Sequence, residues 1–290
     1  MRPANIVTAV SDILAGIAIA CFVVGIKWTE LSFLPVFLLV LSTIGLYGGG
    51  VVFNDVFDAE LDKKERPERP IPSGLISKNS AAVFATMLLI LAVVVAAFVH
   101  DQLFSFSFFI ALAIAIAAVV YDKWGKHHSF LGPLNMGLCR GLNLLLGMSI
   151  FPEVLLAYWP ISFVPVIYIA AITMISRGEV HGGKKTTLLA AVVFYFIVIA
   201  SILATAIGNG SLVYAIGFVV LFVALIFPPL LKAFREPRGP LIGKAVKAGV
   251  IALIAMNASW AAAFGAFYFA LLILLLLPLS LWLAKLFAVT

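Results

Sequence analysis

Charged residues are scarce in this chain of 290 residues: Asp, Glu, Lys and Arg together make up 11% of it, whereas hydrophobic residues make up 64%. Soluble globular domains typically carry about 25% charged residues. The shortage of charge therefore excludes an ordinary soluble domain. Several apolar runs reach the roughly 20 residues that a helix needs to cross a bilayer. Because strict alternation of apolar and polar residues is also missing, the sequence predicts an all-α polytopic membrane protein.

Cysteine is almost absent as well. The two cysteines, Cys21 and Cys139, both lie inside apolar runs, which argues against a disulfide framework or a cysteine metal cluster. Acidic residues are fewer than basic ones, and the net charge is +6. In a membrane protein this excess indicates basic cytoplasmic loops. We therefore expect the lipid bilayer as a partner and no nucleic acid, and the sequence identifies no protein partner.

Ten apolar stretches bounded by charge, proline or glycine are candidate membrane helices. They cover residues 5–26, 33–54, 79–99, 103–121, 131–151, 158–176, 187–207, 211–231, 242–262 and 266–287. If all ten cross the membrane, sixteen of the nineteen Lys and Arg residues fall on the side of the N-terminus. The positive-inside rule then places the N-terminus and the loops after even-numbered spans in the cytoplasm.

A faint internal repeat relates two parts of the chain. Asp55 closes the second span, and Glu179 follows the sixth span 124 residues later. Two four-helix halves, each with a polar site after its second helix, explain this spacing. We expect one integral-membrane domain over 1–290, made of pseudo-repeats at about 1–121 and 131–231 and of C-terminal helices at 242–287.

The segment 54–74 holds six of the thirteen acidic residues. If the second helix continues past Asn54, then Asp55, Asp58 and Asp62 lie within about 60° of one another on one face, and Glu60 points away. Three carboxylates on one face repel each other unless a cation lies between them. Oxygen ligands suit Mg²⁺, which is commonly held by one or two carboxylates, waters and substrate phosphates. The pattern predicts a platform for a metal-bridged diphosphate, and the alternative is a solvated charge run.

This segment also resembles a known motif. The pattern Asn-Asp-x-x-Asp-x-x-x-Asp at 54–62, followed by Arg66-Pro67 and by Arg-Pro-Ile-Pro-Ser-Gly at 69–74, resembles the first aspartate motif of the UbiA superfamily of intramembrane prenyltransferases. The resemblance implies nine to ten helices around a central cavity, with two motifs facing each other across its cytoplasmic mouth. It also implies Mg²⁺-dependent transfer of a prenyl group from a prenyl diphosphate to a small acceptor, with aromatic acceptors among the candidates.

The second motif of that superfamily, Asp-x-x-x-Asp, is incomplete here. Glu179 overlays its first acidic position, and Gly183 overlays its second. His181 lies between them, but a neutral imidazole is a poor substitute in a site of hard oxygen ligands. Lys184 and Lys185 can neutralise a diphosphate directly, as point charges. The segment 176–183 also resembles the EboC-type branch of the superfamily, which keeps a non-catalytic binder of prenyl lipids as an alternative.

Two further sites carry charge near or inside the apolar runs. The loop 121–128 resembles a Tyr-plus-Lys segment of the superfamily, in which Lys123 or Lys126 would grip a phosphate oxygen. Arg140 lies deep inside a predicted span, where a charged guanidinium must face a cavity and have a partner. We expect it to reach the diphosphate or an acidic acceptor, and the alternative is an internal pair with Asp12.

Together these patterns give a candidate site. The expected catalytic residues are Asp55, Asp58, Asp62 and Glu179, which with Asn54 are also the expected Mg²⁺ ligands. The expected substrate-binding residues are Asn54, Arg66, Arg69, Lys123, Lys126, Arg140, Asn143, Arg177, His181 and Lys184. A CDP-alcohol phosphotransferase is disfavoured because its aspartate pattern is missing from the sequence. A cation-coupled transporter is disfavoured because the acidic cluster lies at a helix end and not at the bilayer midplane.

Overall fold

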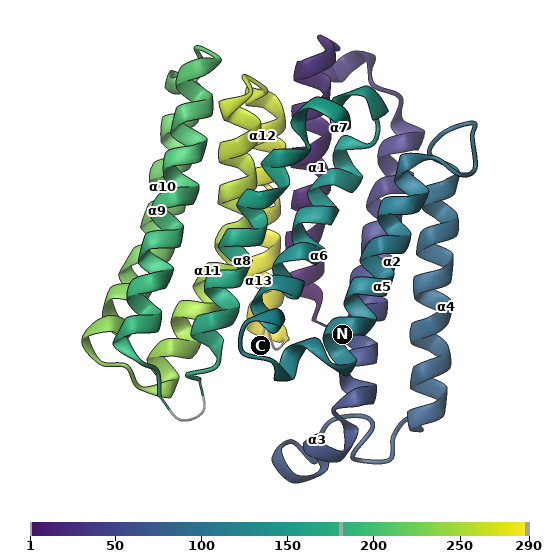
Figure 1. Cartoon of the computed structure of the whole chain (residues 1–290), viewed down its shortest axis with the longest axis vertical. Helices are drawn as coiled ribbons and strands as arrows, with labels where there is room; N and C mark the ends of the chain where they lie inside the picture. Colours follow the sequence, from purple (N-terminus) through teal and green to yellow (C-terminus); the bar gives the residue numbers. More distant parts are fainter. Residues whose placement is uncertain (1, 180–181, 288–290) are drawn as a thin grey trace.

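The computed structural model describes residues 2–179 and 182–287, and its regular structure in these ranges is helical (Figure 1). The α-helices are α1 (Pro3–Val24), α2 (Phe33–Phe57), α3 (Ala59–Glu65), α4 (Lys78–Ala97), α5 (Phe106–Lys123), α6 (Leu131–Met148), α7 (Pro152–Tyr158), α8 (Phe163–Ser176), α9 (Lys185–Gly208), α10 (Leu212–Arg235), α11 (Gly239–Ala263), α12 (Phe267–Leu274) and α13 (Leu276–Leu286). Short 3₁₀ turns at Trp28–Glu30, Gly125–His127 and Trp159–Ser162 join some of them.

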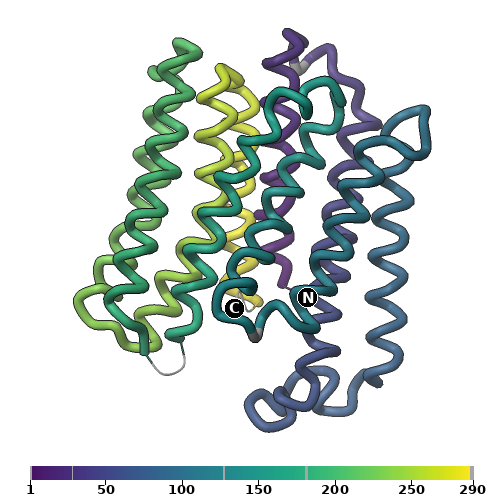
Figure 2. The backbone as a smooth tube through the Cα atoms, viewed as in Figure 1, coloured from purple at the N-terminus to yellow at the C-terminus, as the bar shows by residue number. Residues whose placement is uncertain are grey.

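Within the described ranges, nine segments are long and apolar enough to cross a membrane. Two of these segments join consecutive helices: α7 with α8, and α12 with α13. The predicted span that is not among these nine is the fifth, at 131–151; it forms α6, which lies among α1, α5 and α8 but contains Arg140 and two asparagines. Ser280 on α13 donates a hydrogen bond to the Ala4 carbonyl on α1 at 3.2 Å, and Figure 2 shows both chain ends at one end of the bundle. This arrangement needs an even number of crossings, which α6 completes.

Two predicted boundaries are wrong. Residues 152–157, expected as a connection between spans, form helix α7, because Pro152 occupies the first helical turn, where its missing N–H costs no hydrogen bond. The last span is interrupted at Leu275, between α12 and α13. Pro278 explains this interruption, since it has no N–H to donate to the preceding turn.

Helices α1 and α11 form the centre of the bundle. Of their apolar segments, 72% and 67% of residues are buried, against 39% or less in the other spans. The contact between α1 and α6 depends on two glycines. A Cβ atom on Gly16 would lie 2.3 Å from the Leu144 carbonyl oxygen, and one on Gly147 would lie 2.3 Å from that of Ile13. Small residues at such crossings let membrane helices approach closely, which fixes α6 against the centre.

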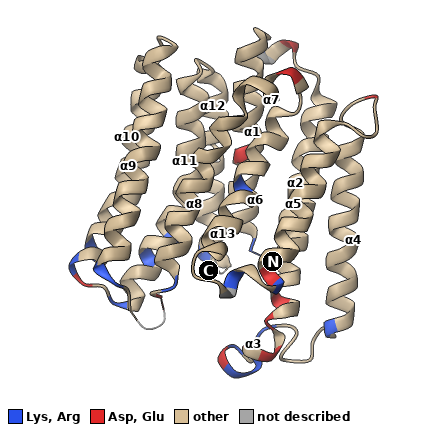
Figure 3. Cartoon of the chain, in the orientation of Figure 1, with Lys and Arg blue, Asp and Glu red and all other residues tan. Residues whose placement is uncertain are grey.

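Charge is distributed unevenly along the bundle axis. Figure 3 shows that Lys and Arg gather at the end where both termini lie, together with the acidic side chains of the α2–α3 region. Large apolar side chains cover the outer faces, and on α4 they include Val83, Phe84, Met87 and Ile90, all at least 49% exposed. This surface suits the hydrocarbon of a bilayer.

Candidate active site

The acidic row lies where α2 passes into α3. The helix is interrupted at Asp58 alone, so the prediction of one uninterrupted helix is wrong at that residue. Its hydrogen bonding continues nevertheless: the Asp58 N–H donates to the Asn54 carbonyl at 2.9 Å, and the Asp62 N–H donates to the Asp58 carbonyl at 2.8 Å. The row therefore keeps helical spacing, and Asp55 and Asp62 face the same way.

Two cations hold this row together. Arg69 Nη1 lies 3.3 Å from Asp55 Oδ1 and 2.7 Å from Asp62 Oδ2, so two carboxylates converge on one cationic nitrogen. Lys126 Nζ forms an ion pair with Asp58. The three aspartate side chains are 29%, 19% and 6% exposed in chain order, which excludes a row splayed into open water.

Glu60 behaves as the helical spacing predicts. Its side chain is 71% exposed and pairs with Lys63 at 3.0 Å, away from the row. These contacts lower the pKa of Glu60, first through the hydrogen bond from Lys63 and then through its charge. Glu60 is therefore a solvated charge and lies outside the site.

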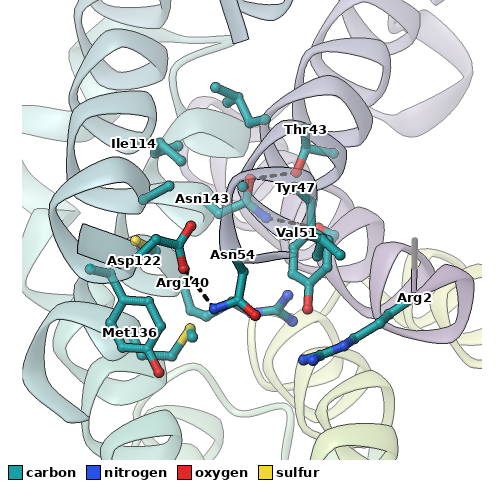
Figure 4. Close-up of a pocket in the computed structure, with 16 residues that line it drawn as sticks. Arg2, Thr43, Tyr47, Val51, Asn54, Ile114, Asp122, Met136, Arg140 and Asn143 are labelled. Atoms are coloured by element: carbon teal, nitrogen blue, oxygen red, sulfur yellow. Dashed lines mark hydrogen bonds between the residues drawn. The ribbon is translucent and has the colours of Figure 1, made fainter. Parts of the chain in front are cut away.

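Asn54 lies at the upper end of the row and contacts a residue that sequence reasoning missed. Its Nδ2 donates to Asp122 Oδ1 at 3.1 Å, across the gap between α2 and α5 (Figure 4). Asp122 is only 4% exposed. One signal was available in the sequence: a carboxylate directly after Tyr121, at the end of an apolar span. The sequence could not predict that Asp122 contacts Asn54, because this contact depends on how α5 packs against α2.

A cavity lies between α1, α2, α5 and α6, and Asn54, the residue before Asp55, is part of its lining (Figure 4). Its empty space, including the open mouth, is about 820 Å³. The walls are mostly apolar and aromatic, and polar groups lie at the mouth and at the deep end. The lining residues are Arg2, Ala9, Thr43, Leu46, Tyr47, Gly50, Val51, Asn54, Ile114, Ala118, Tyr121, Asp122, Met136, Cys139, Arg140 and Asn143.

The deep end of the cavity is a buried polar network centred on Asp12. Arg140 Nε lies 2.9 Å from Asp12 Oδ2, so the pair considered as the alternative for Arg140 is present. Asn143 donates to Asp12 Oδ2 at 3.1 Å and accepts from Thr43 Oγ1 at 2.7 Å. Asn257 donates to Asp12 Oδ1 at 2.7 Å. The network ties α1, α2, α6 and α11 together while Arg140 still lines the cavity.

The second motif lies in the loop after α8. Glu179 is half-buried, and its Oε1 has no hydrogen-bond partner among residues 2–179 and 182–287. Burial raises the pKa of Glu179, while the nearby charges of Arg66 and Arg2 act in the opposite direction. Glu179 therefore feels the charge of residues from the first part of the chain, including Arg2, which lines the cavity.

Gly183 leaves no room for the missing acid. Its N–H donates to the Pro237 carbonyl at 3.1 Å, and a Cβ atom there would lie 2.7 Å from Ile242 Cδ1. Ile242 is fully buried. An aspartate at this position would require Ile242 to move. His181, a predicted substrate-binding residue between these two, lies outside the described residues.

The structure separates the predicted cations. Lys126 and Arg69 contact the acidic row, as described above. Lys123 instead places its Nζ 4.4 Å from the centre of the Trp124 ring, and it is exposed. The Arg177 guanidinium donates to the His128 carbonyl at 2.6 Å and so fixes the loop before α6. Lys184 is exposed at the start of α9.

The carboxylate and amide oxygens of the first motif are arranged so that they could bind Mg²⁺ together with a diphosphate. No three His, Cys, Asp or Glu side chains in the described ranges are grouped closely enough to hold a metal ion by themselves. Asp55 and Asp62 nevertheless converge on the position of one cationic nitrogen, with the Asn54 amide nearby. Mg²⁺ commonly takes one or two carboxylates and completes its coordination with water and substrate phosphates. The first motif therefore fits an ion that binds together with a diphosphate.

Similarity to known proteins agrees with this geometry. The sequence profile of the UbiA prenyltransferase family matches residues 13–239. The digeranylgeranylglyceryl phosphate synthase of Sulfurisphaera tokodaii is 28% identical over 240 residues, which are 75% of this chain and 83% of that protein. The enzyme of the same name from Sulfolobus acidocaldarius is 30% identical over 206 residues, which are 68% of this chain and 71% of that protein.

Solved structures share the fold. A UbiA homologue from Aeropyrum pernix superposes with a TM-score of 0.71 at 15% identity, covering 89% of this chain and 98% of that one. A structure described as digeranylgeranylglyceryl phosphate synthase in membranes gives a TM-score of 0.63 at 21% identity, covering 91% and 95%. The profile match spans most of the chain and includes both motifs, and the fold agrees. The chain therefore belongs to the UbiA prenyltransferase family, as an integral membrane prenyltransferase.

Proposed function

We propose that this enzyme holds a prenyl diphosphate at the acidic mouth of the cavity and transfers its prenyl group to a small acceptor inside the bundle. One observation carries this proposal: a row of three cation-paired carboxylates directly follows Asn54, which lines a cavity with mostly apolar walls. The names of the relatives favour an acceptor that contains glyceryl phosphate. A small aromatic acceptor is the alternative.

The first motif would bind the diphosphate. Asp55 and Asp62 would hold Mg²⁺, Asn54 would add an oxygen ligand, and Asp58 would stand beside them. When bound, Mg²⁺ neutralises the negative charge that builds on the diphosphate as its bond to the prenyl carbon breaks. In the structure described here, Arg69 occupies the position between Asp55 and Asp62, and it keeps these two carboxylates together before substrate binds.

The remaining charges and the walls would serve the leaving group and the allylic cation. Arg69 and Lys126 place positive charge at the mouth, where negative charge develops on the departing diphosphate. Leu46, Val51 and Ile114 line the cavity. Such apolar walls keep out water that would otherwise quench the allylic cation before the acceptor attacks it.

We place this mouth on the cytoplasmic side. It lies at the end of the bundle where Lys and Arg gather, and the positive-inside rule assigns that end to the cytoplasm (Figure 3). A substrate whose headgroup is charged and whose tail is hydrocarbon enters such a site without leaving the bilayer.

A second candidate function is that of a protein that binds a prenyl lipid without catalysing transfer. The resemblance of residues 176–183 to the EboC-type branch raised this alternative. The observation that favours it is the incomplete second motif, where Gly183 is packed against Ile242. It predicts that a prenyl diphosphate binds and is recovered intact.

The test is an assay in detergent with radiolabelled prenyl diphosphates of increasing length, with and without Mg²⁺. Glyceryl phosphate lipids and small aromatic acids are supplied as acceptors. We expect acceptor-dependent release of diphosphate that requires Mg²⁺ and is abolished in Asp58→Asn, while Glu60→Gln stays active. Binding without release would support the non-catalytic binder, and movement of ions across proteoliposomes would support a transporter.

A further inference from the structure

We propose that Arg2 binds the diphosphate directly, and that it takes the place of a second metal ion at this mouth. The proposal rests on the proposed function, because it names a further substrate-binding residue for the same reaction. It arises from an arginine that lines the cavity and whose guanidinium has no hydrogen-bond or ion-pair partner in the part of the chain that the structure describes.

The position of Arg2 is fixed by the start of α1. Its carbonyl accepts hydrogen bonds from the N–H groups of Asn5 at 3.0 Å and Ile6 at 3.3 Å, and Pro3 occupies the first helical position. The backbone is therefore part of the helix end. The side chain is half-buried and lines the cavity, reaching towards the mouth as Figure 4 shows.

Arg2 differs from the other cations around the cavity in being uncommitted. Arg140, the other cationic residue of the lining, is paired with Asp12, and Arg69 and Lys126 are paired with the acidic row. The Arg2 guanidinium makes no hydrogen bond or ion pair with any residue in the described ranges. It acts on Glu179, Asp122 and Tyr121 through its charge alone.

A half-buried guanidinium without a partner favours an anionic ligand that supplies oxygen acceptors. Its planar fork of donors matches two oxygens of one phosphate group, and such charge-assisted bonds are stronger than those between neutral groups. The ligand already proposed for this mouth carries two phosphates. Arg2 stands on the α1 side of the cavity, and the acidic row stands at the end of α2, so a diphosphate between them is gripped from two sides.

The missing second carboxylate of the second motif supports the assignment of Arg2 as a diphosphate-binding residue. A second Mg²⁺ would need two carboxylates after α8, and this chain has only Glu179 at the two motif positions, with Ile242 filling the space beside Gly183. Positive charge on that side of the mouth must then come from side chains. Arg2 is half-buried within the cavity, whereas Arg66, the other cation acting on Glu179, is exposed.

The test uses the full-length protein in detergent and inorganic pyrophosphate as the probe, titrated calorimetrically in the presence of a chelator. We expect Arg2→Gln to weaken metal-free binding by roughly tenfold to a hundredfold, the range for a hydrogen bond to a charged group. Arg2→Lys should recover part of the loss. Arg235→Gln, at an exposed arginine on α10 far from the cavity, should bind like the wild type.

Asp58→Asn separates this proposal from the proposed function. That variant should lose prenyl transfer, yet it should bind pyrophosphate without metal at least as tightly as the wild type, since a negative charge has been removed. A wild-type protein that transfers no prenyl group would defeat the proposed function and leave the pyrophosphate readout intact. Unchanged metal-free affinity in both Arg2 variants would overturn the role of Arg2.

The number of metal ions gives an independent readout. Titration with Mn²⁺ at saturating pyrophosphate, followed by electron paramagnetic resonance, should show one bound ion per chain. Two ions per chain would overturn the replacement of a second metal by Arg2. If Arg2→Gln does not fold, Arg2→Lys carries the affinity comparison, because it keeps the charge and loses only the fork of donors.

Discussion

The α2–α3 junction, here called the first loop, and the loop after α8, the second loop, are built differently. At the α2–α3 junction three aspartates lie in a row, and each is paired with a cation. After α8, one half-buried glutamate stands beside a glycine whose missing side chain leaves its space to Ile242. The first loop concentrates carboxylates and cations, and the second has a single carboxylate at the two motif positions.

This difference bears on which groups, metal ions or cationic side chains, would neutralise the charge of a bound diphosphate. A symmetric site would use a metal ion on each side. Here the carboxylates are concentrated at the α2–α3 junction, and in our proposal Arg2 supplies positive charge on the other side. The buried network around Asp12 holds α2, which carries the first loop, against α1, α6 and α11.

The largest expected effect is on the first loop. Asp62→Asn keeps the size of the side chain but removes the charge that contacts Arg69 at 2.7 Å. We expect kcat/KM to fall by roughly 100- to 1,000-fold, the range for losing one preorganised electrostatic group, with little change in thermal unfolding. Steady-state kinetics in detergent would check this. Activity within threefold of the wild type would mean that the two loops do not differ as described.

The next effect concerns the buried network around Asp12, which ties α2 to α1, α6 and α11. Asp12→Ala leaves Arg140 buried with no carboxylate, so the free energy of unfolding should fall by about 3 kcal/mol. Adding Arg140→Met should restore much of that loss, because the unpaired charge is removed. Unfolding in mixed micelles, read by tryptophan fluorescence, measures both. A loss below about 1 kcal/mol in the single variant would contradict a structural role for this pair.

A smaller effect tests whether the second loop can be made like the first. Gly183→Asp should not raise activity, and overpacking against Ile242 should lower the melting temperature by about 2–4 °C. Combining it with Ile242→Ala should remove the clash. The number of Mn²⁺ ions bound by the single and double variants is then compared. We expect a second bound ion only in the double variant, where the space beside residue 183 has been cleared. A second ion in the single variant would contradict the packing argument.

The smallest effect is the pH dependence of Glu179. Burial raises its pKa above the ordinary value of 4.5, so the folded protein favours the neutral carboxyl. That contribution to stability is fully present below the ordinary pKa and is lost as the pH rises through the raised one. Thermal melts from pH 4.5 upwards should show this decline in the wild type and not in Glu179→Gln. Identical profiles would show that Glu179 is not desolvated at the mouth.

Parts of the site were predictable because charge is conspicuous in an apolar chain. The row from Asp55 to Asp62 follows from helical spacing, and Arg140 stands out because a guanidinium inside a span must have a partner. The spans followed from hydropathy, except where Pro152 starts a helix and Pro278 disturbs one.

The rest depended on contacts between distant helices. Sequence spacing could not choose between Lys123 and Lys126, since the turn after α5 decides which one faces Asp58. Asp122 and Arg2 were missed for the same reason: each acquires its place only when α5 or α1 packs beside α2. The space beside Gly183 is likewise filled by a residue 59 positions later in the chain.

The most direct measurement is a structure of the protein in lipid nanodiscs with a non-hydrolysable prenyl thiodiphosphate and Mn²⁺. The account predicts a diphosphate at the mouth with one Mn²⁺ bound by Asp55 and Asp62, Arg2 on its other side, and the prenyl chain in the cavity lined by Leu46 and Ile114. A diphosphate bound elsewhere, with Arg69 still bridging Asp55 and Asp62, would contradict it.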